Sequence, residues 1–106
     1  MTETYIRAAA LSDVKPGKMQ CTRIAGHRIL LANVAGKIFA TDELCTHEDH
    51  TLCNGALHGE LVSCSLHGSR FSVRTGEPQE EPARVALRTY PVRVEGMDIL
   101  VGIPQT

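Results

Sequence analysis

Apolar residues along this chain fall into short runs, and small turn-forming pairs separate these runs. The pairs end in glycine, which enters tight turns easily: Pro16-Gly17, Ala25-Gly26, Ala35-Gly36, Asn54-Gly55, His58-Gly59, Thr75-Gly76 and Glu95-Gly96. The runs between them are rich in Val, Ile, Leu, Phe and Tyr, and several alternate apolar with polar residues: 18–24, 28–34, 37–41, 60–64, 70–75, 87–94 and 97–103. This pattern predicts β-strands joined as hairpins.

No segment keeps a helical period long enough to compete with this interpretation. Pro78 and Pro82 interrupt the one charged stretch that has helical character. Residues 5–14 are ambiguous, because their alanines favour a helix whereas their position favours a first strand followed by a short turn.

The predicted fold class is all-β, a small antiparallel sandwich or barrel built of hairpins. Strand alternation would place Tyr90, Val92 and Val94 on one strand face. Because no internal repeat, low-complexity segment or linker interrupts the chain, we predict a single domain over residues 1–106.

Composition and charge argue against nucleic acid and membranes as binding partners. The chain is 42% hydrophobic and 22% charged, and eleven basic and twelve acidic residues give a formal net charge of -1. This balance provides no electrostatic footprint for nucleic acid or for an anionic membrane surface. The longest apolar runs, residues 8–11 and 29–32, are far shorter than the ~20 residues that span a bilayer. We therefore expect neither a nucleic-acid partner nor a membrane partner.

The N-terminal residues lack the pattern of an export signal. Glu3, Arg7 and Asp13 occupy positions where a signal peptide would carry a basic start and an apolar run. A cytoplasmic location is therefore expected, and there thiols are kept reduced. Four cysteines in such a chain favour metal or redox chemistry over a disulfide framework.

Residues 45–71 hold three of the four cysteines and four of the five histidines. Two boxes in this stretch each offer one thiolate and one imidazole: Cys45-Thr46-His47 and Cys64-Ser65-Leu66-His67, with residues 48–63 between them. Two Cys/His pairs on two hairpin loops suit a Rieske [2Fe-2S] centre. A structural zinc site with two cysteines and two histidines is the alternative, although the usual zinc-finger spacings do not organise these boxes.

The two boxes resemble the Rieske signature, Cys-x-His followed at a distance by Cys-x-x-His-Gly. The resemblance extends to FATDELCTH (39–47), LHGSRFSVRTGEP (66–78) and LRTYPVRVEG (87–96), which look like the ferredoxin components of bacterial ring-hydroxylating dioxygenase systems. It therefore covers nearly the whole chain.

The resemblance implies one [2Fe-2S] cluster and assigns its ligands. Cys45 and Cys64 would hold the inner iron, and His47 and His67 the outer iron. It also implies a Rieske-type domain in which a cluster-binding subdomain of two ligand loops, approximately residues 43–75, is inserted within a basal β domain. Candidate donors to the cluster sulfurs are the loop backbone, Thr46, Gly68 and Ser69.

One departure from the family separates two subtypes. High-potential Rieske proteins of respiratory complexes add a disulfide whose cysteines would stand at His50 and Leu66. They also carry a tyrosine hydroxyl where this chain has Phe71. Fewer donors to the cluster sulfurs imply a potential toward the low end of the Rieske range.

The other reactive side chains receive modest interpretations. Cys21 and Cys53 are expected to be free thiols without a role, and His27, His50 and His58 to be surface side chains. Pro82 matches the family's third loop, which covers the cluster. The acids near the boxes and this loop are a hypothetical docking ring for basic partners: Asp42, Glu43, Glu48, Asp49, Glu80 and Glu81.

The function that the resemblance implies is one-electron transfer, not catalysis by this chain alone. The carrier would accept electrons from a flavoprotein NAD(P)H reductase and donate them to a terminal Rieske non-haem iron oxygenase of aromatic hydrocarbon catabolism. No separate facial triad for oxygen chemistry is found in the sequence. The small Rieske-like subunit of an assimilatory nitrite reductase and a zinc-stapled interaction module remain alternatives.

Overall fold

The chain folds into three antiparallel sheets, as the computed structural model shows for residues 3–46, 50–65, 69–80 and 85–104. The elements in chain order are β1 (Glu3–Ala10), η1 (Leu11–Asp13), β2 (Met19–Ile24), β3 (His27–Val34), β4 (Lys37–Asp42), η2 (Leu52–Asn54), β5 (Ala56–His58), β6 (Leu61–Ser63), β7 (Arg70–Ser72), β8 (Pro78–Glu80), β9 (Thr89–Tyr90), β10 (Val92–Glu95) and β11 (Asp98–Pro104). The predicted all-β class is confirmed.

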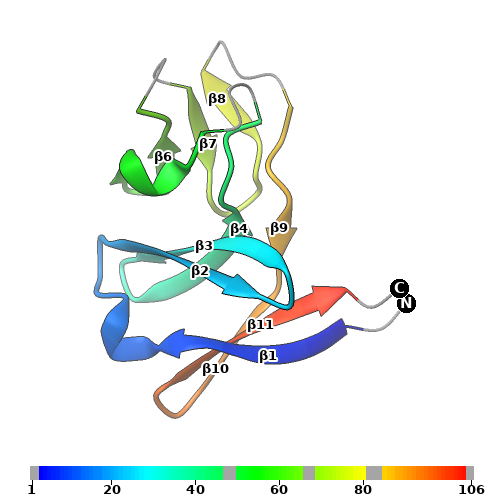
Figure 1. Ribbon diagram of the computed structural model, residues 1–106. Helices are drawn as coiled ribbons and strands as arrows, with labels where there is room; N and C mark the ends of the chain where they lie inside the picture. The colour runs from blue at the N-terminus through cyan, green and yellow to red at the C-terminus, as the bar shows by residue number, and fades with distance from the viewer. Residues whose placement is uncertain (1–2, 47–49, 66–68, 81–84, 105–106) are drawn as a thin grey trace.

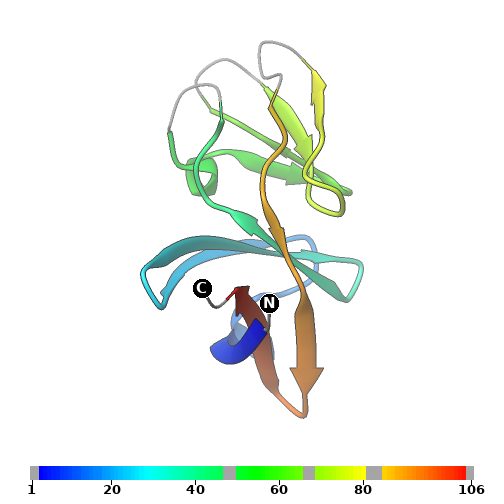
Figure 2. The same ribbon diagram turned by 90° about the vertical axis from the view of Figure 1, so that its right-hand side faces the viewer.

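The sheets are stacked along the long direction of the molecule. One sheet has the order β1-β11-β10, the middle one β2-β3-β4-β9, and the third β5-β6-β7-β8. Figures 1 and 2 show the third sheet at the upper end, apart from the other two. In the lowest sheet Glu3 pairs with Pro104, so the two ends of the described chain lie side by side.

Strand β3 is buried on both of its faces. Ile29 and Leu31 belong to a hydrophobic cluster with residues of the β1-β11-β10 sheet, such as Ile99 and Val101. Leu30 and Ala32 point the other way and join a second cluster. Since successive side chains of a strand alternate between faces, a continuous apolar run at 29–32 is what a central, two-sided strand requires.

The second cluster joins the middle sheet to the third sheet. Its buried members are Leu30, Ala32, Cys45, Leu52, Val62, Cys64, Phe71, Val73 and Leu87. These residues come from strand β3, from the η2 turn, from strands β6 and β7, and from four connecting segments that hold Cys45, Cys64, Val73 and Leu87. The third sheet is therefore held on the body of the molecule by apolar packing as well as by chain connectivity.

The prediction that Tyr90, Val92 and Val94 share one strand face is wrong. Pro91 divides the run: Tyr90 in β9 pairs with β4 of the middle sheet, whereas β10 pairs with β11 of the lowest sheet. Tyr90 is buried while Val94 is 44% exposed. Proline has no N–H to donate, so the chain leaves one ladder there and joins another.

Two further sequence-based expectations can be compared with the structure. Residues 5–14 form most of β1 followed by the short η1 turn, which is the strand-and-turn alternative. Strands β5 and β8 lie outside all of the predicted runs, because their sequences, ALH and PQE, contain no β-branched or aromatic residue.

Within the described residues, no helix is long and apolar enough to cross a bilayer.

The two faces of β3 lead to a paired prediction. Leu30→Ala and Leu31→Ala each remove a fully buried side chain, so each should lower the free energy of unfolding by about 2–5 kcal/mol. Amide hydrogen exchange should separate the two variants: Leu30→Ala should expose β6 and β7 most, and Leu31→Ala should expose β1 and β11. The same exchange pattern in both variants would contradict the assignment of the two faces.

Candidate metal centre

Two cysteines from different loops meet in the cluster between the middle and third sheets. Cys45 follows β4 and is 0% exposed, and Cys64 follows β6 and is 3% exposed. Both pack in the hydrophobic cluster that also contains Phe71 and Val62. The fold thus brings together two thiols that are far apart in the sequence.

The two loops that begin at these cysteines are closed in the same way. The amide of Cys45 donates to the carbonyl of His50 at 2.9 Å, and the amide of Cys64 donates to the carbonyl of Ser69 at 2.8 Å. Each hydrogen bond spans the same number of residues, so the sequence places one predicted histidine ligand inside each loop. This repeated geometry is the strongest structural feature of the site.

The predicted histidine ligands, His47 and His67, lie outside the described residues, as do Pro82 and Gly68. The donor chemistry still fits an iron–sulfur cluster that needs two thiolates and two imidazoles. Thiolates Cys45 and Cys64 would stand on the protein side, shielded from water, with one imidazole in each loop. The ligand assignment itself stays a prediction.

The first loop is anchored at its base by Glu43, two residues before Cys45. Arg28 of β3 donates to this carboxylate from Nε at 3.3 Å and from Nη2 at 2.8 Å. The Thr51 hydroxyl donates to Glu43 Oε2 at 2.5 Å, and the amide of Leu52 donates to the Glu43 carbonyl at 2.9 Å. The Glu43 carboxylate therefore connects the start of the first loop to Thr51 at its end and to Arg28 of β3.

The environment of Glu43 favours its charged form. Burial raises its pKa, but the hydrogen bonds from Arg28 and Thr51 and the nearby positive charge outweigh burial, so the pKa lies below its usual value. Sequence inspection missed this pair, although hairpin register would have found it. Val34 pairs with Lys37 across the Ala35-Gly36 turn, and continuing that register puts Arg28 opposite Glu43.

Thr46 connects the first loop to the segment that follows Pro82. Its hydroxyl donates to the carbonyl of Val85 at 2.7 Å. A hydroxyl has one proton to donate, and in this structure Val85 receives it, so donation by Thr46 to a cluster sulfur stays a prediction. This hydrogen bond holds the first ligand loop against the segment that contains Val85. Val85 itself is 64% exposed beside this contact.

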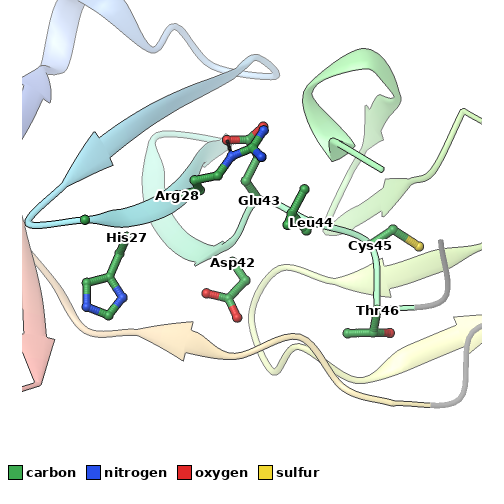
Figure 3. Close-up of a pocket in the computed structure, with 8 residues that line it drawn as sticks. His27, Arg28, Asp42, Glu43, Leu44, Cys45 and Thr46 are labelled. Atoms are coloured by element: carbon green, nitrogen blue, oxygen red, sulfur yellow. Dashed lines mark hydrogen bonds and ion pairs between the residues drawn. The ribbon is translucent and has the colours of Figure 1, made fainter. Parts of the chain in front are cut away.

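An open pocket of about 410 Å³ lies beside the first loop (Figure 3). Its lining combines polar and charged groups with the buried thiol: Gly26, His27, Arg28, Asp42, Glu43, Leu44, Cys45 and Thr46. His27 was expected to be a solvated surface residue, but it is half-buried and meets the Tyr90 ring edge-on at 6.0 Å between centroids. His58 is exposed, as predicted, and His50 is half-buried.

Two of the acids proposed for the docking ring, Asp42 and Glu43, form contacts within the structure. Glu43 is buried in its ion pair with Arg28. Asp42 accepts a hydrogen bond from the Tyr90 hydroxyl at 2.6 Å, and burial together with Asp42 raises the Tyr90 pKa. Both carboxylates therefore form contacts within the structure, and docking through the acids stays a prediction. Glu48, Asp49 and Glu81 lie outside the described residues.

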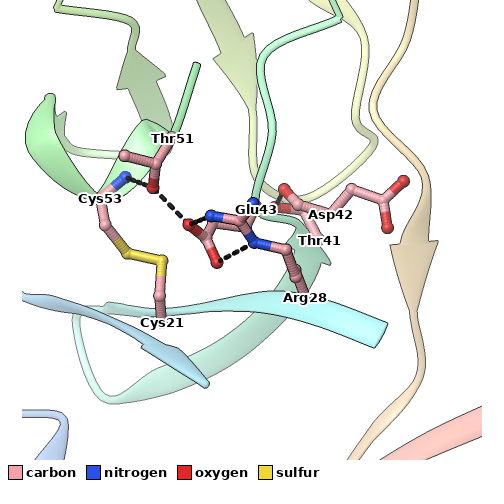
Figure 4. The surroundings of a disulfide bond; sticks show 7 residues. All are labelled: Cys21, Arg28, Thr41, Asp42, Glu43, Thr51 and Cys53. Atoms are coloured by element: carbon pink, nitrogen blue, oxygen red, sulfur yellow. Dashed lines mark hydrogen bonds and ion pairs between the residues drawn. A yellow bond between two sulfur atoms is a disulfide. The ribbon is translucent and has the colours of Figure 1, made fainter. Parts of the chain in front are cut away.

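The expectation of free thiols at Cys21 and Cys53 is wrong in this structure, where they form a disulfide with 6.2 Å between their Cα atoms (Figure 4). Cys21 is in β2 and Cys53 in η2, so the bond joins the middle sheet to the segment after the first loop. Sequence analysis did not predict this pairing, because thiols were expected to stay reduced in the cytoplasm. Sequence spacing offered no signal for it, since it depends on how η2 packs on β2.

Comparison with known proteins identifies relatives over almost the full chain. Residues 4–91 match the Rieske [2Fe-2S] domain family. The ferredoxin component of the naphthalene 1,2-dioxygenase/salicylate 5-hydroxylase systems of Ralstonia sp is 39% identical over 101 residues, which cover 95% of this chain and 97% of that protein.

Solved structures have the same fold. A chain of the complex of reduced oxygenase and oxidized ferredoxin in carbazole 1,9a-dioxygenase superposes with a TM-score of 0.86 at 30% identity, covering 92% of each chain. A protein described as an NADH-dependent nitrite reductase small subunit of Mycobacterium tuberculosis gives a TM-score of 0.88 at 19% identity and 100% coverage of both chains. The second likeness shows a shared fold and no more.

The Arg28–Glu43 pair gives a testable prediction. Arg28→Met leaves the Glu43 carboxylate buried with one hydrogen-bond partner fewer, and should lower the free energy of unfolding by about 1–2 kcal/mol. Adding Glu43→Gln should recover part of this loss, because the uncompensated charge is removed. Denaturant titration of the anaerobic protein measures both effects.

The matched control is the exposed pair of Arg7 and Asp98, at 2.8 Å. Arg7→Met should change the free energy of unfolding by less than about 1 kcal/mol, because exposed ion pairs contribute little. If Arg28→Met is no more costly than Arg7→Met, Glu43 does not anchor the loop.

Proposed function

Because the chain belongs to the Rieske [2Fe-2S] family, we propose that it is a one-electron carrier between a flavin-dependent NAD(P)H reductase and a terminal ring-hydroxylating oxygenase. The observation that carries this proposal is the pair of buried cysteines at the start of two identically closed loops. Its ferredoxin-component relative matches over nearly all of both chains, so no additional catalytic domain is needed. The chain is not a catalyst by itself.

In this proposal Cys45 and Cys64 hold the inner iron, and His47 and His67 hold the outer iron. A cluster with two neutral imidazoles carries less negative charge than one with four thiolates, and it accepts an electron more easily, at about -150 to +300 mV rather than about -400 mV. The chain's own contribution is to hold the ligand loops and to keep water from the thiols. Leu52, Val62 and Phe71 do this from the surrounding cluster.

The surroundings of the thiols favour the lower part of that range. Phe71 is fully buried in the cluster with both cysteines and offers no hydroxyl. The amides of Cys45 and Cys64 are engaged in loop closure, and the Thr46 hydroxyl donates to Val85. Among the described residues, Phe71 and Thr46 thus add no hydroxyl donor to the cluster sulfurs in this structure, and fewer donors lower the potential.

The same proposal divides the domain by role. Residues 43–75, approximately, form the cluster-binding subdomain within the basal β domain, and β8 extends the sheet of this subdomain beyond residue 75. The connection between them is the second hydrophobic cluster together with the Arg28–Glu43 pair. We further place the protein in the cytoplasm, where NAD(P)H is available to the proposed reductase.

A redox titration tests the proposed function directly. Anaerobically purified protein, followed by visible absorbance and by the low-temperature spin signal of the reduced state, should show a one-electron couple near the low end of the Rieske range. The potential should fall only at alkaline pH, where the imidazoles deprotonate.

The control for this titration is Cys64→Ser, which should lose the absorbance and the spin signal. A potential a few hundred millivolts higher would contradict the argument from missing donors. A colourless protein that contains zinc would overturn the cluster. Tight copurification with a large reductase chain would favour a nitrite reductase subunit instead.

The remaining acids near the first loop give a kinetic prediction. If Glu48 and Asp49 attract basic patches of the partners, Glu48→Lys with Asp49→Lys should slow electron transfer to the oxygenase, mainly at low salt. The matched control is Glu95→Lys with Asp98→Lys on the β10–β11 hairpin, which makes the same change in net charge on a different sheet. Equal slowing by the two double variants would indicate net charge alone, and an unchanged low-salt rate would refute docking through these acids.

A further inference from the structure

The Cys21–Cys53 disulfide joins the basal β domain to the proposed cluster-binding subdomain. Cys21 lies in β2 of the middle sheet, and Cys53 lies in η2, immediately after the first ligand loop. The two residues are 32 positions apart in the sequence. Figure 4 shows the bond bridging the β2 strand and the η2 turn. It therefore fastens the exit of the first ligand loop to the body.

One cysteine of this disulfide, Cys53, lines a hollow of the structure. Both cysteines are half-buried, whereas Cys45 and Cys64 are fully buried. A hollow of about 300 Å³ is lined by Cys53 and by residues of both flanking segments, among them Lys18, Met19 and Gly55. Thiol–disulfide exchange needs access for an attacking thiolate, and a lysine ammonium beside the path favours the thiolate form. Lys18 lines the same hollow as Cys53, which suits such an exchange.

A short chain of hydrogen bonds leads from the disulfide to the base of the ligand loop. The amide of Cys53 donates to the Thr51 hydroxyl oxygen at 3.2 Å, and that hydroxyl donates to Glu43 Oε2 at 2.5 Å. Glu43 stands two residues before Cys45 and is tied to β3 through Arg28. These hydrogen bonds connect Cys53 to the residue that anchors the loop.

We propose that Cys21–Cys53 is a second redox site of this chain, a two-electron thiol–disulfide couple that exchanges with small thiols of the glutathione class. Opening it releases η2 from β2 and loosens the base of the first ligand loop. Disulfides in reducing compartments are commonly transient or redox-sensing, which is the behaviour that an accessible bond at this joint predicts.

The exchange takes place in two balanced steps. The thiolate of one small thiol attacks the Cys53 sulfur, a mixed disulfide forms, and the Cys21 thiolate leaves and takes a proton. A second small thiol attacks the mixed disulfide, which gives the Cys53 thiol and the oxidised small-molecule disulfide. Two small thiols supply the two electrons and two protons, and Cys21 and Cys53 end as two thiols.

The test uses the complete protein with its cluster, equilibrated anaerobically in buffers of graded reduced-to-oxidised glutathione ratio. Alkylation followed by peptide mass spectrometry gives the fraction of Cys21 and Cys53 in the thiol form, a readout that does not depend on the proposed electron-carrier function. Bleaching of the visible absorbance at moderately raised temperature gives the cluster lifetime in the same samples.

We expect Cys21 and Cys53 to be protected without added thiol, and to become alkylated together along one titration curve. The cluster lifetime should shorten several-fold along the same curve. Cys21→Ser with Cys53→Ser should show the short lifetime at every ratio. Lys18→Gln should slow the approach to equilibrium and leave the midpoint in place. Thr51→Val should shorten the lifetime without changing the titration of the disulfide.

Three results would overturn the proposal. Full alkylation of Cys21 and Cys53 without added thiol would mean that no disulfide forms. Resistance to reduction at every glutathione ratio would make the bond a permanent structural link. Reduction with an unchanged cluster lifetime would disconnect it from the ligand loop. Absence of a cluster, with normal titration of the disulfide, would instead count against the proposed function alone.

Discussion

The two-sided burial of β3 is the constraint on which the rest of the structure depends. A strand of this length presents two sets of side chains, and here neither set can face water, because Ile29 and Leu31 as well as Leu30 and Ala32 are fully buried. One face needs the β1-β11-β10 sheet, and the other needs the layer that contains both cysteines of the candidate centre. The placement of three layers in a chain this short follows from one apolar run.

The candidate centre inherits its rigidity from this arrangement. Its two thiols are embedded among apolar side chains that the body of the domain already orders, so the loops have only to place the remaining ligands. The Arg28 side chain extends from the same strand β3 to Glu43, and adds a directed, charged contact to the undirected apolar one. Packing fixes the depth of the first loop, and the ion pair fixes its register relative to β3.

The sequence contained much of this information, but not all of it. Turn pairs and apolar alternation located most strands, and the Cys/His boxes pointed to the same thiols that the fold buries together. The division at Pro91 was missed because alternation continues through the proline, while the missing N–H that ends the ladder leaves no trace in hydrophobicity. The Cys21–Cys53 bond was missed for a different reason. Its partners approach only after η2 has packed on β2, and no local pattern encodes a contact of that kind.

The pairing of Glu3 with Pro104 has a consequence for how this domain can be joined to others. Both ends of the described chain, Glu3 and Pro104, lie at adjacent positions on the β1-β11-β10 sheet, which is the layer farthest from the loops that begin at Cys45 and Cys64. A tether, a surface attachment or a second protein fused at either end would leave those loops unobstructed. A short linker between the ends, with new termini opened at the β2–β3 turn, would give a circular permutant that keeps every layer in place.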